Sequence, residues 1–401
     1  MKCRFEDRRA ARALELSGAR ERFVAQRPQD LDGVFAAISR AQAVGRWVAL
    51  VADYELGEWL LPAALRTPAG YADCACRTSI DQPRLTALTF EHVENTTPWT
   101  NGFEQLDEAR DRPRYPIRQA TTSLGTAAAQ AGILSVTPAI SQEDYLAKVE
   151  DIRAMIERGQ LYQLNYAFPF DVRTQGEPEA IYRALAERHA SAHAAYIEDE
   201  SRTILSFSPE LFLARKGARV ITRPMKGTAP RHHDPIADVA AGRALSASVK
   251  DRSENLMIVD LLRNDLGQLA RPGSVSVDAL FTLEKYASVW TLTSTVSADV
   301  PNTGLRALLT AMFPCGSITG APKLAAMQHI RRLESGPRGV YCGAIGWLAP
   351  DGDMSLNVAI RTLVLDSPNR GRYFAGGGIV YDSVPESEWQ ECLWKARVLT
   401  R

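Results

Sequence analysis

The sequence predicts a large globular fold that mixes helices with strands, and three observations lead to this expectation. Its 401 residues are enough to bury a sizeable core, in one big domain or in two. The hydrophobic fraction of 45% and the charged fraction of 23% are those of an ordinary soluble globular protein. Segments with apolar residues at helical spacing stand beside short segments that are apolar throughout or alternate like strands.

The charge balance and the absence of long apolar runs exclude several classes of function. Lys plus Arg and Asp plus Glu each number 47, which argues against general nucleic-acid or anionic-membrane binding. No apolar run approaches the length of a membrane span, and the charged N-terminus lacks the apolar centre of a signal peptide. Of six cysteines only Cys74 and Cys76 lie close together, so we interpret all six as reduced thiols. We therefore expect a cytoplasmic protein that acts on a small molecule.

The first third of the chain carries few signals. Residues 30–42 have helical spacing, and 47–54 (WVALVADY) is predicted to be a buried strand. Residues 97–125 are rich in Pro, Gly, Arg and Asp and are predicted to form a loop.

Regular structure is predicted again from Ser141, which can cap a helix that Gly159 ends. The segment 161–168 then alternates like a strand and places Gln163 and Asn165 on one face. Polar side chains at alternate positions fit either a solvent face or a site, and this choice stays open.

The loop 223–231 (RPMKGTAPR) contains Lys226 between a stiffening proline and a flexible glycine. If this lysine is partly buried, it loses proton affinity and can act as a nucleophile; otherwise it is a solvated surface residue. Two strands, 203–207 and 210–214, precede the loop and are separated by a break. Glu210 at that break is close enough along the chain to meet Lys226 across a hairpin.

The strongest helix signal covers residues 250–267, where Gly267 is a natural end. Its predicted buried stripe is Leu256, Val259, Leu262 and Leu266. Asp251 and Glu254 lie one turn apart near its start. They suit the helix dipole, and they are also the hard oxygen ligands that Mg²⁺ prefers.

In residues 313–323 (FPCGSITGAPK), small residues lead into a helix that Thr319 can cap, which leaves backbone N–H groups for a carboxylate or phosphate. Strands are predicted at 340–348 and 357–365, as a pair, with Arg361 on the second. A further strand at 373–380 contains three glycines, which would let a ligand approach the main chain.

The last predicted helix begins with a capping box at Ser383–Glu386. Glu388, Glu391 and Lys395 follow at spacings that place them on one helical face. An exposed, salt-bridged face is the plainer interpretation of this spacing.

Four long segments in order, SENLMIVDLLRNDLG, FPCGSITGAPK, GAIGWL with NVAIRT, and AGGGIVYDSVPESEWQECLWKA, resemble the chorismate-utilising enzymes. This family includes the anthranilate, isochorismate and salicylate synthases and enzymes that aminate chorismate. The resemblance implies an α+β, anthranilate synthase component I-like fold, in which two antiparallel β-sheets pack face to face, helices lie outside and the site is in the cleft between the sheets. It also implies one chorismate-binding domain over 1–401, with a variable N-terminal region at 1–125 and a catalytic region at 141–401.

The resemblance implies a Mg²⁺ cofactor held by Glu254 and Glu391, with Asp251 and Glu388 as supporting acids. The ion would offset the charge of the ring carboxylate of chorismate. The implied substrate-binding residues are Thr228, Thr319, Gly320, Tyr341, Arg361, Gly377, Gly378 and Lys395.

Three positions bear on the reaction. Lys226 stands where anthranilate synthases have alanine, and the aminating members use a lysine there. Gln163 replaces the water-activating lysine of isochorismate and salicylate synthases, and Thr291 replaces a histidine of anthranilate synthases. The implied mechanism is attack of Lys226 at C2 with Glu210 as general acid, followed by addition of ammonia at C4.

A glutamine amidotransferase partner is expected to supply the ammonia, since no glutaminase-like nucleophile elbow is found in the 401 residues. The implied product is 4-amino-4-deoxychorismate, a precursor of 4-aminobenzoate and folate. Two alternatives stay open: an anthranilate synthase component I, and a homologue that binds chorismate without turning it over.

Overall fold

A computed structural model describes residues 1–400 except 69–81, 100–130, 189–190 and 287–288. The strands formed by these residues join through antiparallel pairs into one continuous ladder. The predicted loop at 97–125 lies outside the described residues from 100 onward, as do Cys74 and Cys76. Cys3, Cys315, Cys342 and Cys392 are free thiols.

The ladder can be followed as two arms, and each arm contains strands from early, middle and late parts of the sequence. The first arm runs through β5 (Gly132–Pro138), β6 (Gln163–Gln175), β18 (Arg370–Ile379), β17 (Thr362–Ser367), β8 (Thr203–Ser208), β7 (His193–Glu198), β1 (Lys2–Asp7) and β2 (Arg12–Ala25). The second arm continues through β4 (Leu85–Thr96), β3 (Trp47–Ala52), β15 (Ala344–Leu348), β16 (Met354–Val358), β9 (Leu211–Lys216), β10 (Arg219–Arg223), β13 (Val289–Asp299) and β12 (Ser276–Lys285). The two-residue strand β14 (Gly320–Ala321) adds to β6, and β11 (Met225–Pro230) adds to β13.

The two arms pack against each other, because each of the two largest hydrophobic clusters takes side chains from both. Phe170 and Tyr373 of the first arm share one cluster with Leu213 and Leu356 of the second. The predicted α+β class is therefore confirmed. The facing sheets are two arms of one hydrogen-bonded ladder.

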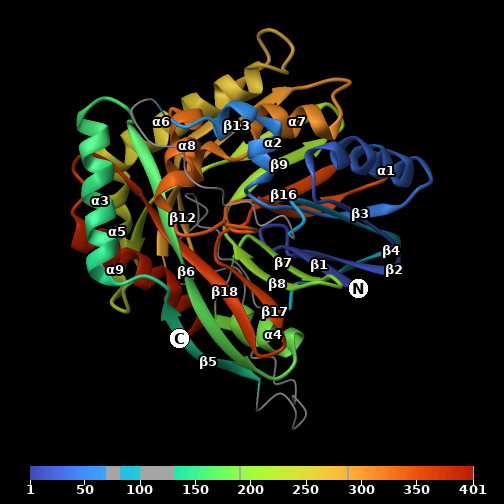
Figure 1. Cartoon of the computed structure of the whole chain (residues 1–401), viewed down its shortest axis with the longest axis horizontal. Coiled ribbons are helices and arrows are strands. Elements are labelled where there is room, and N and C mark those ends of the chain that lie inside the picture. The colour runs from blue at the N-terminus through green and yellow to red at the C-terminus, as the bar shows by residue number, and fades with distance from the viewer. Residues whose placement is uncertain (69–81, 100–130, 189–190, 287–288, 401) are drawn as a thin grey trace.

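Helices cover the outside of the ladder. They are α1 (Leu31–Ala43), α2 (Leu56–Leu60), α3 (Gln142–Glu157), α4 (Pro178–Arg188), α5 (Pro235–Ala247), α6 (Val249–Gly267), α7 (Leu305–Met312), α8 (Lys323–Leu333) and α9 (Pro385–Ala396). Figure 1 shows α3, α5 and α9 along one side of the molecule and α6, α7 and α8 along an adjacent side. α9 packs on β18 of the first arm, and α6 packs on β13 of the second arm. These two helices therefore cover strands of both arms. Among the described residues, no helix combines the length and apolarity needed to cross a membrane.

Several local predictions are confirmed. The helix over 30–42 is α1 and the strand over 47–54 is β3, each within two residues of the expected ends. The Ser141 hydroxyl accepts a hydrogen bond from the Asp144 backbone N–H (3.1 Å), so it caps α3 as expected. α6 ends at Gly267.

Two expected caps are wrong, because both side chains make other local hydrogen bonds. The Thr319 hydroxyl donates to the carbonyl oxygens of Cys315 (3.2 Å) and Gly316 (3.3 Å), and α8 begins after Pro322 without a side-chain cap. Ser383 donates to Glu388 Oε1 (2.7 Å), while Val384 holds the N-cap position of α9.

Two further corrections concern exposure and strand length. Leu256 is 45% exposed, so the buried stripe of α6 lacks its first predicted member. The predicted strand over 357–365 is two strands, since β16 ends at Val358 and β17 begins at Thr362. Arg361 lies in the break with φ of +51°, a conformation that ends strand pairing. The expected pairing does occur between β15 and β16.

Candidate active site

One cavity of about 270 Å³ gathers most of the predicted site residues. The predicted residues that line it are Glu210, Lys226, Thr228, Asp251, Glu254, Tyr341, Arg361, Gly378, Glu388, Glu391 and Lys395. Thr319, Gly320 and Gly377 are outside this lining, although Ser317, Ile318 and Gly376 beside them belong to it. The cavity therefore joins segments that lie far apart in the sequence.

Lys226 and Glu210 reach the cavity from two separate segments of the chain. Lys226 lies on β11, and Glu210 occupies the break between β8 and β9. Burial lowers the pKa of Lys226, against the opposing charges of Glu254 and Glu210. Burial raises the pKa of Glu210 to about 7, although a hydrogen bond from Ser317 and the charge of Lys226 oppose the rise. One cavity thus holds an amine with weakened proton affinity and a carboxyl group with strengthened proton affinity.

The chain bends sharply after Lys226. The pairing of β11 with β13 shifts register between Lys226 and Thr228, and Gly227 has φ of +80°. A Cβ atom on Gly227 would lie 2.8 Å from Asp251 Oδ1, so a side chain would not fit. The predicted role of glycine at the exit of this loop therefore has a structural cause: β11 passes close to the start of α6.

Acidic side chains from two helices define one end of the cavity. Asp251 and Glu254 come from α6, and Glu388 and Glu391 come from α9. Burial raises the pKa of Glu254, and the charge of Glu391 adds to that rise. The charge of one carboxylate therefore raises the pKa of another, as happens among acidic groups that share a cation.

Lys395 already neutralises one of these acids. Its Nζ atom lies 2.7 Å from Glu391 Oε1 and donates to the Gly376 carbonyl oxygen (2.7 Å). The charge of Lys395 lowers the pKa of Glu391. The predicted shared face of Glu391 and Lys395 on the last helix thus lines the cavity, where the Glu391 side chain is still 45% exposed.

The cavity offers carboxylates that could hold Mg²⁺, but its described side chains do not form a complete cage of protein ligands. In the described part of the chain, no three Asp, Glu, His or Cys side chains converge closely enough to form a ready-made metal site. Mg²⁺ is usually bound through one or two carboxylates plus substrate oxygens and water, so it does not require such a cage. Glu254 on α6 and Glu391 on α9 line the same cavity and offer two such carboxylates.

The glycines of β18 are explained by the chain's own side chains. A Cβ atom on Gly377 would lie 2.8 Å from Glu388 Oε2, and one on Gly378 would lie 2.2 Å from Gln163 Nε2. The strand therefore passes closely between a side chain of α9 and one of β6. Gln163 is buried, and within the described residues its Oε1 atom has no hydrogen-bond partner. Both polar residues of the 161–168 segment are buried, and Asn165 lines the cavity.

Arg361 and Tyr341 supply the other end of the lining. The break between β16 and β17 places the Arg361 guanidinium at the cavity, where burial lowers its pKa. Tyr341 stacks on Phe374 with ring centroids 5.3 Å apart. The Thr291 hydroxyl donates to the Gly227 carbonyl oxygen (2.9 Å), so this residue supports the bend after Lys226. Cationic, aromatic and acidic groups together suit a ring that carries carboxylates.

Among the lining residues that were not predicted as site residues are Lys250 and Ser317, and Asn165, whose role the sequence left open, also lines the cavity. Ser317 lies within the GSITG segment, two residues before Thr319, and its hydroxyl donates to Glu210 Oε1 (2.6 Å). Lys250 comes directly before Asp251, so its sequence position was the available signal. Neither spacing nor residue type indicates which of these side chains points inward.

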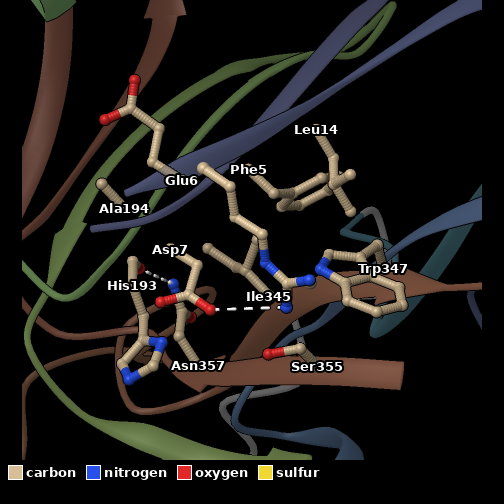
Figure 2. A pocket seen from close by; sticks show the side chains of 12 residues that line it. Phe5, Glu6, Asp7, Leu14, His193, Ala194, Ile345, Trp347, Ser355 and Asn357 are labelled. Carbon is tan, nitrogen blue, oxygen red and sulfur yellow. Dashed lines mark hydrogen bonds and ion pairs between the residues drawn. The ribbon is translucent and has the colours of Figure 1, made fainter. Parts of the chain in front are cut away.

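A second hollow of about 40 Å³ lies elsewhere, between β1, β7, β15 and β16. Figure 2 shows its lining, which includes Asp7, His193, Trp347 and Asn357. Asn357 Nδ2 donates to the His193 carbonyl oxygen (2.8 Å), and Arg12 donates to Asp7 (3.5 Å). No predicted site residue lines this hollow, and it is much smaller than the 270 Å³ cavity.

The chain is similar to known proteins both in sequence and in fold. The family described as chorismate binding enzyme matches residues 6–401. The chain is 43% identical over 259 residues to aminodeoxychorismate synthase component 1 of Klebsiella aerogenes, a match that covers 64% of this chain and 57% of that protein. It is 42% identical over 260 residues to the protein of the same name from Escherichia coli strain K12, covering 64% of this chain and 56% of that protein. The match thus spans little more than half the length of these relatives.

The fold is shared with solved structures over nearly the whole chain. Anthranilate synthase component I from Streptococcus pneumoniae superposes with a TM-score of 0.78 at 25% sequence identity. That similarity covers 98% of this chain and 92% of the other.

Proposed function

Because the chain belongs to the chorismate binding enzyme family, we propose that it aminates chorismate at C4, as an aminodeoxychorismate synthase component 1. The product would be 4-amino-4-deoxychorismate, on the route to 4-aminobenzoate and folate. The observation that carries this proposal is the shared cavity of Lys226 and Glu210, whose pKa values are shifted in opposite directions. Those shifts favour a neutral amine and a protonated carboxyl, the forms that a nucleophile and a general acid need.

The reaction begins with the two buried groups. The neutral amine of Lys226 attacks C2 of chorismate, the double bond shifts, and the C4 hydroxyl departs with the proton of Glu210 as water. Ammonia then adds at C4, the double bond returns, and the lysine amine leaves C2. Glu210 regains a proton from the ammonium nitrogen during this second half, so protons balance over the cycle.

Mg²⁺ is the cofactor in this proposal, with Glu254 and Glu391 as the holding residues and Asp251 and Glu388 as supporting acids. When bound, the ion would supply positive charge opposite the ring carboxylate of the substrate. Lys395 lies 2.7 Å from Glu391 and partly offsets its charge. Glu391 would therefore interact with both the lysine and the metal ion.

The remaining lining residues would bind and orient the diacid. The Arg361 guanidinium suits a carboxylate, since its fork of N–H donors matches two oxygens. Tyr341 offers an aromatic face to the ring, and Thr228 offers a hydroxyl close to Lys226. Thr319, Gly320 and Gly377 would act from just behind the lining, through the segments that carry Ser317 and Gly376.

The proposal includes a glutamine amidotransferase partner that delivers ammonia, and it places the reaction in the cytoplasm. The name component 1 of the two relatives supports a separate partner subunit. Anthranilate formation would use the same substrate, so the assay has to separate the two products.

The test is incubation of the purified chain with chorismate, Mg²⁺ and ammonium at alkaline pH. We expect an amino acid that retains the enolpyruvyl group, identified by mass spectrometry. Fluorescent anthranilate in its place would assign the other activity, and the absence of any turnover would indicate a homologue that binds without catalysis.

A further inference from the structure

A row of buried polar side chains is hydrogen-bonded to Glu210, and these side chains have no role in the proposed reaction. The Ser317 hydroxyl donates to Glu210 Oε1 at 2.6 Å, a short hydrogen bond. The Cys315 Sγ atom lies 3.2 Å from the same hydroxyl oxygen. All three side chains are at least 95% buried, so water does not compete for these contacts.

The backbone of Glu210 is fixed from other directions. Its N–H donates to Ser208 Oγ (3.2 Å), and its carbonyl oxygen accepts from the Val358 N–H (3.0 Å). The backbone is therefore anchored to β8 and β16, while the direction of the carboxyl group depends on the side-chain torsions. Two hydrogen bonds reach the carboxyl group and restrain those torsions, one from the Ser317 hydroxyl and one from the Met225 backbone N–H.

We propose that Ser317, supported by Cys315, is a positioning residue that aims the carboxyl group of Glu210 at the substrate. A hydroxyl that donates to Oε1 leaves the proton of the carboxylic acid on Oε2. The proton then sits on Oε2, the oxygen that Ser317 does not contact, and passes from there to the departing C4 hydroxyl. This inference rests on the proposed function, since it concerns the same general acid.

The surroundings of Glu210 make this hydrogen bond matter for proton affinity as well. The charged or titratable groups that face Glu210 are Lys226 on β11, Cys315 before the turn Gly316–Ile318, and Cys342 before β15. Burial raises the pKa of the Cys315 thiol to about 12, so it remains an S–H group that can donate to Ser317. Donation along this row stabilises the carboxylate form of Glu210 and opposes the effect of burial.

The chemical consequence is a balance between orientation and acidity. Without the Ser317 hydroxyl, the carboxyl group would hold its proton more tightly and point in more than one direction. Both changes slow proton transfer to a leaving hydroxyl, and neither alters the groups that bind the substrate carboxylates. A residue with a purely structural role would lower stability without shifting a titration.

The first experiment compares wild type with Ser317→Ala and Ser317→Cys in formation of the Lys226 adduct, followed by intact-protein mass spectrometry without ammonia. We expect the alanine variant to form adduct about 10-fold more slowly or worse, with the KM for chorismate within about twofold. Ser317→Cys keeps a weaker donor of nearly the same shape, so its rate of adduct formation should lie between those of wild type and Ser317→Ala. Equal rates in all three proteins would overturn the proposal.

The second experiment reads the titration of Glu210 directly. Infrared difference spectra against Glu210→Gln isolate the protonated carboxyl band, which is then followed over pH in the absence of substrate. Ser317→Ala should move the midpoint upward by about one pH unit, and one inflection of the pH–rate profile should move with it. An unchanged midpoint would contradict the hydrogen-bond role.

Ser206→Ala is the matched control. Ser206 is equally buried and shares a side-chain hydrogen bond with Thr362 (2.9 Å), but it does not line the cavity. It should lower stability without moving the Glu210 midpoint, and an equal shift in this variant would show that the effect is general. If wild type does not aminate chorismate, the proposed function fails, whereas the infrared titration still decides whether Ser317 controls Glu210.

Discussion

Two regions of this molecule bury charged side chains, and they treat them in opposite ways. On β1, Glu6 lies between Arg4 and Arg8, with ion pairs of 3.2 Å and 3.0 Å. All three side chains are almost fully buried, and Glu6 also accepts a hydrogen bond from the Trp99 backbone N–H (3.0 Å). We refer to these three residues as the β1 charge cluster.

Lys226 and Glu210 lack this pairing, although Lys395 and Glu391 in the same cavity form an ion pair of 2.7 Å. Within the described residues, the Lys226 ammonium group makes no ion pair shorter than 4 Å, and the short contact of the Glu210 carboxyl is with the neutral Ser317. Burial without a partner shifts proton affinity, whereas burial with partners preserves charge and ties strands together. The comparison suggests that the β1 charge cluster contributes to stability and that the cavity charges contribute to catalysis.

The largest expected effect is on the cavity side of this comparison. Lys226→Met should abolish the chorismate adduct in intact-protein mass spectrometry and slow glutamine-dependent turnover about 1,000-fold or more. Its free energy of unfolding should not fall, because the lysine side chain loses no ion pair. Urea unfolding measures this second part. A matched control is Lys216→Met at the exposed end of β9, which should change neither quantity.

A full rate in the methionine variant with glutamine as nitrogen source would refute the nucleophile. Added ammonium is a weaker test, since free ammonia at high concentration can attack C4 directly.

The β1 charge cluster should show the reverse result. Glu6→Gln removes the carboxylate that two buried guanidinium groups share, while Arg4 keeps its ion pair with Glu15 (3.0 Å). We therefore expect a loss of about 3 kcal/mol in the free energy of unfolding, the lower end for a broken buried pair. The turnover per folded molecule should stay near that of wild type. Arg12→Ala is the control, since its pair with Asp7 is exposed and should be worth less than about 1 kcal/mol. A small loss in Glu6→Gln would remove the contrast between the regions.

The pH dependence of stability tests Glu210. Its pKa is raised to about 7 in the folded protein from an ordinary value of 4.5, so the folded state holds this proton more tightly. The associated stability is fully present below about pH 4.5 and is lost as pH rises through about 7. Glu210→Gln avoids this loss, so its gain in unfolding free energy should grow from near zero at about pH 4 to about 3 kcal/mol at about pH 8.

Urea unfolding at several pH values measures this difference. A constant offset between the two proteins across the range would show that burial does not raise the proton affinity of Glu210.

The smallest expected effect concerns Mg²⁺. At a concentration about 100 times its Kd, the ion should raise the free energy of unfolding by about 2.7 kcal/mol. The double variant Glu254→Ala/Glu391→Ala should lose this response. Asp260→Ala is the control on the same helix, because Asp260 is exposed and pairs with Arg263. Equal stabilisation of the double variant would place the metal elsewhere.

The sequence by itself determined the parts of this protein that depend on local chemistry. Helical spacing located α1, α3 and α6, and the Ser141 cap follows from the chain within a single turn. The long segments around Glu254 and Glu391 also indicated which residues share a site, because their amino-acid sequences and their order along the chain resemble one family.

Tertiary structure decided which side chains meet and which are dry. Arg361 leaves the strand pattern, with φ of +51°, and reaches the cavity. Ser317 meets Glu210 across 107 positions of chain. Burial and pairing depend on contacts between segments far apart in sequence, so periodicity, which reports on one segment at a time, carries no information about the pKa of Lys226 or Glu210.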